Sequence, residues 1–137
     1  MTVELALLIP IFVLILLGSV DYGSMIVEKM QLQNAARSGM QYALQSSANI
    51  DDTEGIEEVV RLARGDEDED EELNVSTSVF CECADGSAIV CTATCTGNQP
   101  PRRFVDVTVD KNYQMVFSYP GFGNSTTLTG QATVRVR

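Results

Sequence analysis

The amino-terminal end of the chain is an apolar run that few folds can accommodate. Residues 5–20 read LALLIPIFVLILLGSV and contain no charged side chain. With Met1 to Val3 included, the run approaches the roughly 20 residues that a helix needs to cross a hydrocarbon core of about 30 Å. A helix that is apolar on every side would expose a large hydrophobic surface in a soluble monomer. We therefore expect this segment to lie in a bilayer or in a bundle of its own kind.

Three features argue against a cleaved signal peptide. No Lys or Arg precedes the run, and no small-x-small cleavage site ends it, because Gly18-Ser19-Val20 leads directly into Asp21-Tyr22. Helical spacing also continues beyond the run, at Tyr22, Ile26, Met30, Ala36, Met40 and Leu44. The pattern predicts one helix from about Leu5 to about Gln45, roughly 60 Å long at 1.5 Å per residue.

Glu4 is the charged residue at the apolar end of this helix. A carboxylate at the edge of a membrane-spanning segment is costly unless it lies at the interface or meets a cation. Glu4 is therefore either an acid at the headgroup level or the partner of a positive group, such as a chain-terminal amine, on a neighbouring subunit. Pro10 fits both interpretations, since neighbouring groups or a local kink accommodate proline in membrane helices. Two pairs of small residues have the spacing that lets helices approach closely: Ser19 with Gly23, and Ala35 with Gly39.

A series of short motifs runs along the predicted helix in a characteristic order. They are Val3-Glu4, Ala6-Leu7, Pro10, Gly18, Tyr22-Gly23, Leu32-Gln33-Asn34-Ala35-Ala36-Arg37, Gly39 and Tyr42-Ala43. In this order they resemble the amino-terminal helix of TadE-like proteins, the minor pilins or pseudopilins of tight-adherence (Flp-type) pilus systems, which are related to type IV pili. The resemblance extends more loosely through the cysteine-containing region to the carboxyl end.

The resemblance implies a bacterial precursor that is trimmed by a prepilin peptidase and inserted once in the inner membrane, with its carboxyl-terminal domain in the periplasm. Its implied partners are other pilin subunits and the pilus assembly machinery, at the membrane or in an extracellular filament. The family has a Glu at the fifth position of the mature chain, and Glu4 aligns with it. We expect either that one mature residue is missing from this sequence or that the chain begins at an internal Met. The expected subunit-assembly residues are Glu4, Leu5, Leu8, Pro10, Phe12 and Leu16.

Composition changes after the helix, so we expect two parts: residues 1–48, membrane-spanning in their first half, and an extracytoplasmic α+β domain over 49–137. A short helix, GIEEVVRLARG, follows a cap at Asp51, Asp52 or Thr53, and we expect it to pack on the sheet. Its predicted buried stripe is Ile56, Val59, Val60 and Ala63.

From Asn74 onward the hydrophobic period becomes two, which predicts strands near 75–80, 88–94, 105–110 and 128–136 in a small antiparallel sheet with one covered face. Asp85-Gly86 predicts a hairpin turn, and Pro100-Pro101 and Tyr119-Pro120-Gly121 mark loops.

The cysteines lie in one predicted Cys-rich hairpin, residues 81–95, as Cys81, Cys83, Cys91 and Cys95. Zinc is the first alternative, but structural zinc sites usually show C-x2–4-C spacing and this chain has C-x-C. Beyond a membrane anchor the environment is oxidising, so two disulfides are expected. A turn at Asp85-Gly86 sets Cys81 opposite Cys91, which favours 81–91 with 83–95 over the nested pairing 81–95 with 83–91.

Charge and residue types exclude several functions. The formal net charge is −10, and seven of the acids form the run DEDEDEE at 66–72. We interpret this run as a solvated loop; the alternative, a calcium site, lacks the ligand spacing and central Gly of an EF-hand. Clustered Lys and Arg for nucleic acid are absent from the sequence, as are His and the common catalytic motifs. We therefore expect no cofactor, no metal, no nucleic-acid partner and no catalytic residue.

The combined prediction is a pilin-like structural subunit with an α+β fold: a long helix, a short helix and a disulfide-bonded antiparallel sheet. The alternative is a membrane-tethered extracytoplasmic domain that binds a ligand and does not polymerise. An anchored enzyme ranks third.

Overall fold

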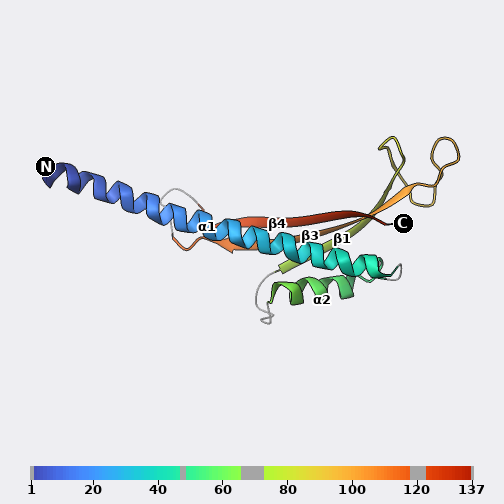
Figure 1. Ribbon diagram of the computed structural model, residues 1–137, viewed down its shortest axis with the longest axis horizontal. Coiled ribbons are helices and arrows are strands. Elements are labelled where there is room, and N and C mark those ends of the chain that lie inside the picture. Colours follow the sequence, from blue (N-terminus) through green and yellow to red (C-terminus); the bar gives the residue numbers. More distant parts are fainter. Residues whose placement is uncertain (1, 47–48, 66–72, 118–122, 137) are drawn as a thin grey trace.

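The computed structural model has a long helix, a short helix and one four-stranded antiparallel sheet (Figure 1). It describes residues 2–46, 49–65, 73–117 and 123–136, apart from the side chains of residues 2–4 and 6. The elements are α1 (Thr2–Gln45), α2 (Thr53–Arg64), β1 (Leu73–Glu82), β2 (Ala88–Ile89), β3 (Arg102–Gln114) and β4 (Ser125–Val136). The α+β fold class is confirmed. The acidic run 66–72 and the Tyr119-Pro120-Gly121 loop lie outside the described residues.

Helix α1 has two halves with different surroundings. Its first half projects away from the rest of the molecule, and the helix continues without a break through Pro10 (Figure 1). Its second half lies along one face of β3 and β4 and belongs to their hydrophobic core. The core residues of this half are fully or almost fully buried: Leu32, Ala35, Ala36 and Ala43. The predicted single helix is confirmed, and the sheet is built onto its carboxyl-terminal half.

The sheet has the strand order β2-β1-β3-β4. The β3–β4 pairing extends from Arg103 opposite Val136 to Gln114 opposite Ser125, and β1 pairs with β3 over its full length. Side chains alternate along β3: Val105, Val107 and Val109 are fully buried under α1, while Asp106, Thr108 and Asp110 lie at intermediate exposure on the opposite face. The predicted single covered face is therefore confirmed.

Helix α2 has the predicted amino-terminal cap and ends at a glycine. The Asp52 carboxylate accepts a hydrogen bond from the Gly55 N–H at 3.0 Å, and Gly65 ends the helix in the left-handed region with φ of 77°. Two predictions about this helix need correction. α2 packs mainly against α1 and touches the sheet only at β1, because α1 already covers the sheet face. Its buried stripe is also narrower than expected, since Ile56 and Val60 are buried, Val59 is half-buried and Ala63 is exposed.

The second predicted strand is shorter than its β-rich sequence indicates. Only Ala88 and Ile89 pair with β1, while the predicted strand continued to residue 94. The chain turns immediately afterwards, where the Ala93 N–H donates to the Val90 carbonyl at 2.9 Å. A continuous strand in this register would place Cys95 opposite Val75 on β1, too far from Cys83 to form the disulfide that joins them.

Two glycines permit the close packing of α1 against its neighbours. A Cβ atom placed on Gly39 would lie 2.6 Å from Cγ2 of Val60 on α2. A Cβ atom on Gly130 of β4 would lie 2.4 Å from the carbonyl carbon of Leu32 on α1. Backbone cannot yield as a flexible side chain does, so α1 and β4 approach this closely only because residue 130 lacks a side chain.

Gly130→Ala is therefore expected to destabilise the fold by about 1–3 kcal/mol, the usual cost of overpacking a core. Urea unfolding of the full chain in mild detergent, followed by circular dichroism, measures this difference. Gly18→Ala is the matched control, because an added Cβ there meets nothing within 4 Å and alanine favours the helix. Equal stability of the two variants would contradict the proposed contact.

Candidate functional site

The apolar surface of the projecting half of α1 is the largest exposed hydrophobic feature among the described residues. Leu5 and Phe12 are each 63% exposed, and Leu8, Pro10 and Leu16 are exposed as well. The structure thus brings five of the six predicted assembly residues together on one helix, without testing their role. Glu4 lies near the start of the same helix, and its side chain is outside those described.

This helix has the length and hydropathy that a membrane span requires, with a candidate region that begins at Leu7. The hydroxyls at its outer end are satisfied internally. Ser19 donates to the Ile15 carbonyl at 2.7 Å, and Ser24 donates to the Val20 carbonyl at 2.9 Å. Hydroxyls bonded in this way add little polar surface to an apolar helix. The amino-terminal half of α1 is therefore suited to membrane anchoring.

Asp21 lies at the end of the apolar run of α1 and contacts the part of the chain that follows α1, which we call the outer domain. The residue is 6% exposed, and its two carboxylate oxygens accept hydrogen bonds from the backbone N–H groups of Val116 at 2.9 Å and Phe117 at 3.3 Å. A buried carboxylate is tolerated when backbone donors replace its water. Asp21 therefore ties the chain that follows β3 to the end of the apolar segment.

Glu28 joins three elements about two turns further along α1. Its Oε1 atom accepts a hydrogen bond from Nζ of Lys111 on β3 at 2.9 Å and also pairs with the Arg64 guanidinium at the end of α2. The side chains are largely withdrawn from water, with exposed fractions of 18% for Glu28, 12% for Lys111 and 3% for Arg64. Their arrangement fixes α2 and the sheet to the same face of α1.

The apolar half, Asp21 and Glu28 all lie in one helix, α1. Residues 1–41 match the family model of the TadE-like proteins. The predicted resemblance is confirmed over this part, which we call the TadE-like segment. No curated protein and no solved structure matches the chain.

The TadE-like segment contains both small-residue pairs, and the structure separates their roles. Ala35 is buried, and Gly39 lies against α2 within the protein. An added Cβ on Gly23 meets nothing within 4 Å, and Ser19 is exposed. Among the two pairs, Ser19 with Gly23 is therefore the one whose surface is open to a helix of another subunit.

Beyond the TadE-like segment, the Cys-rich hairpin has two disulfides. Cys81 bonds to Cys91 and Cys83 bonds to Cys95, with Cα–Cα distances of 5.1 and 5.7 Å. This is the predicted pairing, but the predicted register is wrong, since Cys81 lies opposite Ile89 and Cys91 follows two residues later. The turn itself forms as predicted, since the Cys83 N–H donates to the Ser87 carbonyl at 2.9 Å and Gly86 has φ of 84°. The cysteines are therefore bonded to one another, which excludes the zinc alternative for this structure.

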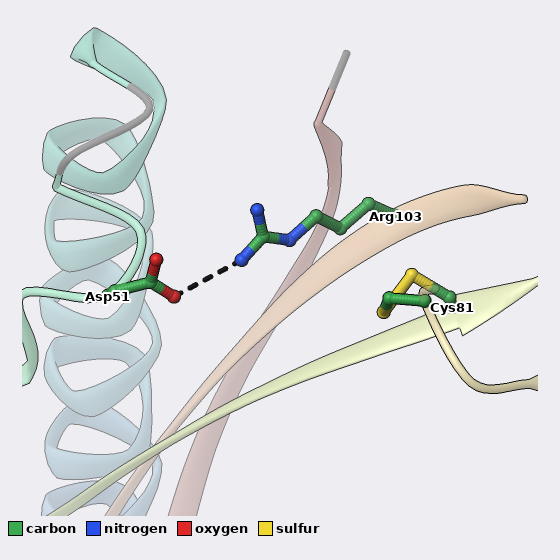
Figure 2. Close-up of a disulfide and its surroundings, with 4 residues drawn as sticks. Asp51, Cys81 and Arg103 are labelled. Atoms are coloured by element: carbon green, nitrogen blue, oxygen red, sulfur yellow. Dashed lines mark hydrogen bonds and ion pairs between the residues drawn. A yellow bond between two sulfur atoms is a disulfide. The ribbon is translucent and has the colours of Figure 1, made fainter. Parts of the chain in front are cut away.

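Close to the first disulfide, an ion pair links the turn before α2 to the sheet. Figure 2 shows Arg103 on β3 reaching towards Asp51, with Nη2 and Oδ1 at 3.1 Å, and Cys81 is the β1 residue that pairs with Arg103. Both side chains are substantially exposed, so the pair contributes at most about 1 kcal/mol. It links the turn that precedes α2 to β3.

The described residues have no cluster of metal-ligating side chains, and two of their titratable groups have shifted pKa values. No group of three or more His, Cys, Asp or Glu side chains is placed to hold a metal ion within them. The perturbed groups have local causes: the hydrogen bond to Asp52 raises the pKa of Tyr42, and hydrogen bonds from Ser87 lower the pKa of Asp85. Both interactions order a cap or a turn.

Sequence reasoning missed Asp21 and Glu28 as site residues. Asp21 was visible as the first charge after the apolar run, and Glu28 as a charge between the apolar positions Ile26 and Met30. Their partners could not be found in this way, because Val116 and Lys111 lie more than eighty residues further along the chain.

Glu28→Ala is expected to reduce the free energy of unfolding by about 1–3 kcal/mol, since it removes a carboxylate that is bonded to two largely buried cations. Glu57→Ala is the control, because Glu57 and Arg61 form an exposed pair within α2 worth less than about 1 kcal/mol. Urea unfolding of both variants in detergent measures the difference. A loss no larger than that of the control would contradict the joining role of Glu28.

The disulfides give a second prediction for this part of the chain. The double variant Cys83→Ser with Cys95→Ser should lose about 2–4 kcal/mol of stability, because the unfolded chain regains the freedom of a closed loop. Thermal unfolding under non-reducing conditions tests this, and treatment of the wild type with a reductant should lower its Tm further. Mass spectrometry that found free thiols in the non-reduced protein would contradict both bonds.

Proposed function

We propose that this protein is a structural, pilin-like subunit of a tight-adherence pilus, held in the inner membrane by the first half of α1 and assembled into the filament or priming it. One observation carries the proposal. A single helix exposes its apolar first half while its second half is fixed in the core of the outer domain. The match to the TadE-like family supports a pilus-associated structural role over an enzymatic one.

The exposed apolar side chains make water an unfavourable environment for this helix. Transfer of one large apolar side chain out of water contributes about 1.5–3 kcal/mol. Large side chains, each roughly half to two-thirds exposed, occupy nearly every position from Leu5 to Leu16, so their summed transfer free energy is comparable with the 5–15 kcal/mol that typically stabilises a whole domain. A bilayer and a bundle of similar helices both remove this surface from water, which allows the same helix to pass from membrane to filament.

The disulfides support the proposed topology. Both bonds lie in the outer domain, and disulfides persist in oxidising compartments such as the periplasm. We therefore place the carboxyl-terminal domain on the periplasmic side, where it would meet other pilin subunits, the assembly machinery and the prepilin peptidase. The open surface at Ser19 and Gly23 supplies a place for close contact with a neighbouring helix.

Glu4 is the residue that we assign to subunit register. It stands at the tip of an apolar helix, where a cationic group from a neighbour would relieve the cost of its charge. Replacement by Ala or Leu should therefore leave membrane insertion intact and reduce incorporation into pili.

The test expresses Glu4→Ala and Glu4→Leu in the native host and compares the protein in sheared filaments with the protein in membranes. Glu58→Ala is the control, because it removes one exposed acid from α2 without altering α1. Wild type and control should appear in sheared filaments, and the Glu4 variants should remain in the membrane fraction. Normal incorporation of both Glu4 variants would contradict the register role. A wild-type protein confined to membranes would instead favour the tethered binding domain.

A further inference from the structure

We infer that the protein has a second membrane contact besides α1: the segment after β3, residues 115–117, lies in the lipid interface beside the helix. This inference rests on the proposed membrane anchoring. Such a contact would hold the outer domain at a fixed depth relative to the bilayer surface. Neither the apolar helix alone nor the match to the TadE-like family implies this.

The first argument is that the segment is fastened to α1. The Asp21 carboxylate accepts the N–H groups of Val116 and Phe117, at 2.9 and 3.3 Å. The Met115 N–H donates to the Asn124 carbonyl at 2.8 Å and extends the β3–β4 pairing by one bond. Figure 1 shows this end of the sheet beside the middle of α1. Residues 115–117 are therefore held at the level of Asp21 on the helix axis.

The second argument concerns depth. A hydrocarbon core of about 30 Å takes roughly 20 helical residues. Counted from Leu5, this length ends at Ser24, so Asp21 lies within one helical turn of the membrane boundary. The exposed charge that follows on α1 is Lys29, about 12 Å further along at 1.5 Å per residue. The level of Asp21 is thus the interface and not the aqueous phase.

The third argument is the chemistry of the exposed groups at this level. Val116, whose N–H is bonded to Asp21, is 63% exposed, and Val20, which precedes Asp21 on α1, is 56% exposed. Tyr22, also 63% exposed, carries the aromatic ring and hydroxyl that favour the membrane–water interface. The one carboxylate here, Asp21, is turned inward and receives two backbone donors. An apolar side chain, an interfacial tyrosine and a shielded acid are what a lipid interface accommodates.

The sequence permits a direct test, because the chain contains no Trp. Three full-length variants each carry one: Val116→Trp at the proposed contact, Phe12→Trp in the apolar half of α1, and Val90→Trp on the exposed distal hairpin. Each is reconstituted in vesicles of phosphatidylethanolamine and phosphatidylglycerol that contain lipids brominated either near the headgroup or deep in the acyl chain.

We expect the emission of Val116→Trp to shift to shorter wavelength in vesicles and to be quenched more by the shallow label than by the deep one. Phe12→Trp should be quenched most by the deep label, and Val90→Trp by neither. Adding Asp21→Ala to Val116→Trp should reduce the shallow quenching, because the segment then loses its fastening to α1.

The outcomes separate this inference from the proposed function. Deep quenching of Phe12→Trp with a Val116→Trp that behaves like Val90→Trp would overturn the second contact and leave the membrane anchor standing. A shifted Val116→Trp emission without quenching would place the segment against protein, such as a second copy, and would also overturn it. An unquenched Phe12→Trp would overturn the anchor itself.

Discussion

The rest of the structure depends on how α1 divides its apolar surface between two environments. The second half uses a stripe of small and large apolar residues to cover the valines of β3. The first half has no complementary stripe and is apolar all round, so no sheet of this size could cover it. One continuous helix therefore serves as an internal element for the domain and as a surface for another phase.

Charged residues mark the change from one environment to the other. Asp21 and Glu28 both point from α1 into the outer domain, and both are satisfied by groups that arrive from β3 or the chain after it. A buried acid without partners would be costly, so each requires the domain to be folded against the helix in one register. Apolar packing alone would allow α1 to slide or rotate over the valines. The two acids, with the close contact at Gly130, fix where the domain sits along the helix.

The sequence predicted the parts of this fold that depend on local patterns. The extent of α1, the cap at Asp52, the turn at Asp85-Gly86 and the disulfide pairing all follow from residue spacing or turn chemistry. The position of α2 could not be predicted from the sequence, because its apolar stripe can pack on a helix as well as on a sheet. The one local sign of the contact between α2 and α1 is Gly39, which lies against Val60. The short length of β2 could not be predicted either, because β propensity does not take into account where the two disulfides place Cys91 and Cys95. For the candidate site, the apolar residues were identifiable, but the partners of Asp21 and Glu28 lie too far along the chain.

The alignment of α1 with β4 has a mechanical consequence. The two elements run alongside each other through the buried half of the helix, and the amino terminus lies at the opposite end of the molecule from the disulfide-bonded hairpin (Figure 1). Tension applied along α1, as in a filament pulled from both ends, would load the interface between helix and sheet in shear. Under shear, many side-chain contacts between helix and sheet bear the load together, whereas peeling the helix off the sheet would break these contacts one at a time. The disulfides lie outside that line of force, so they stiffen the exposed tip while the shear is resisted by the helix–sheet contact.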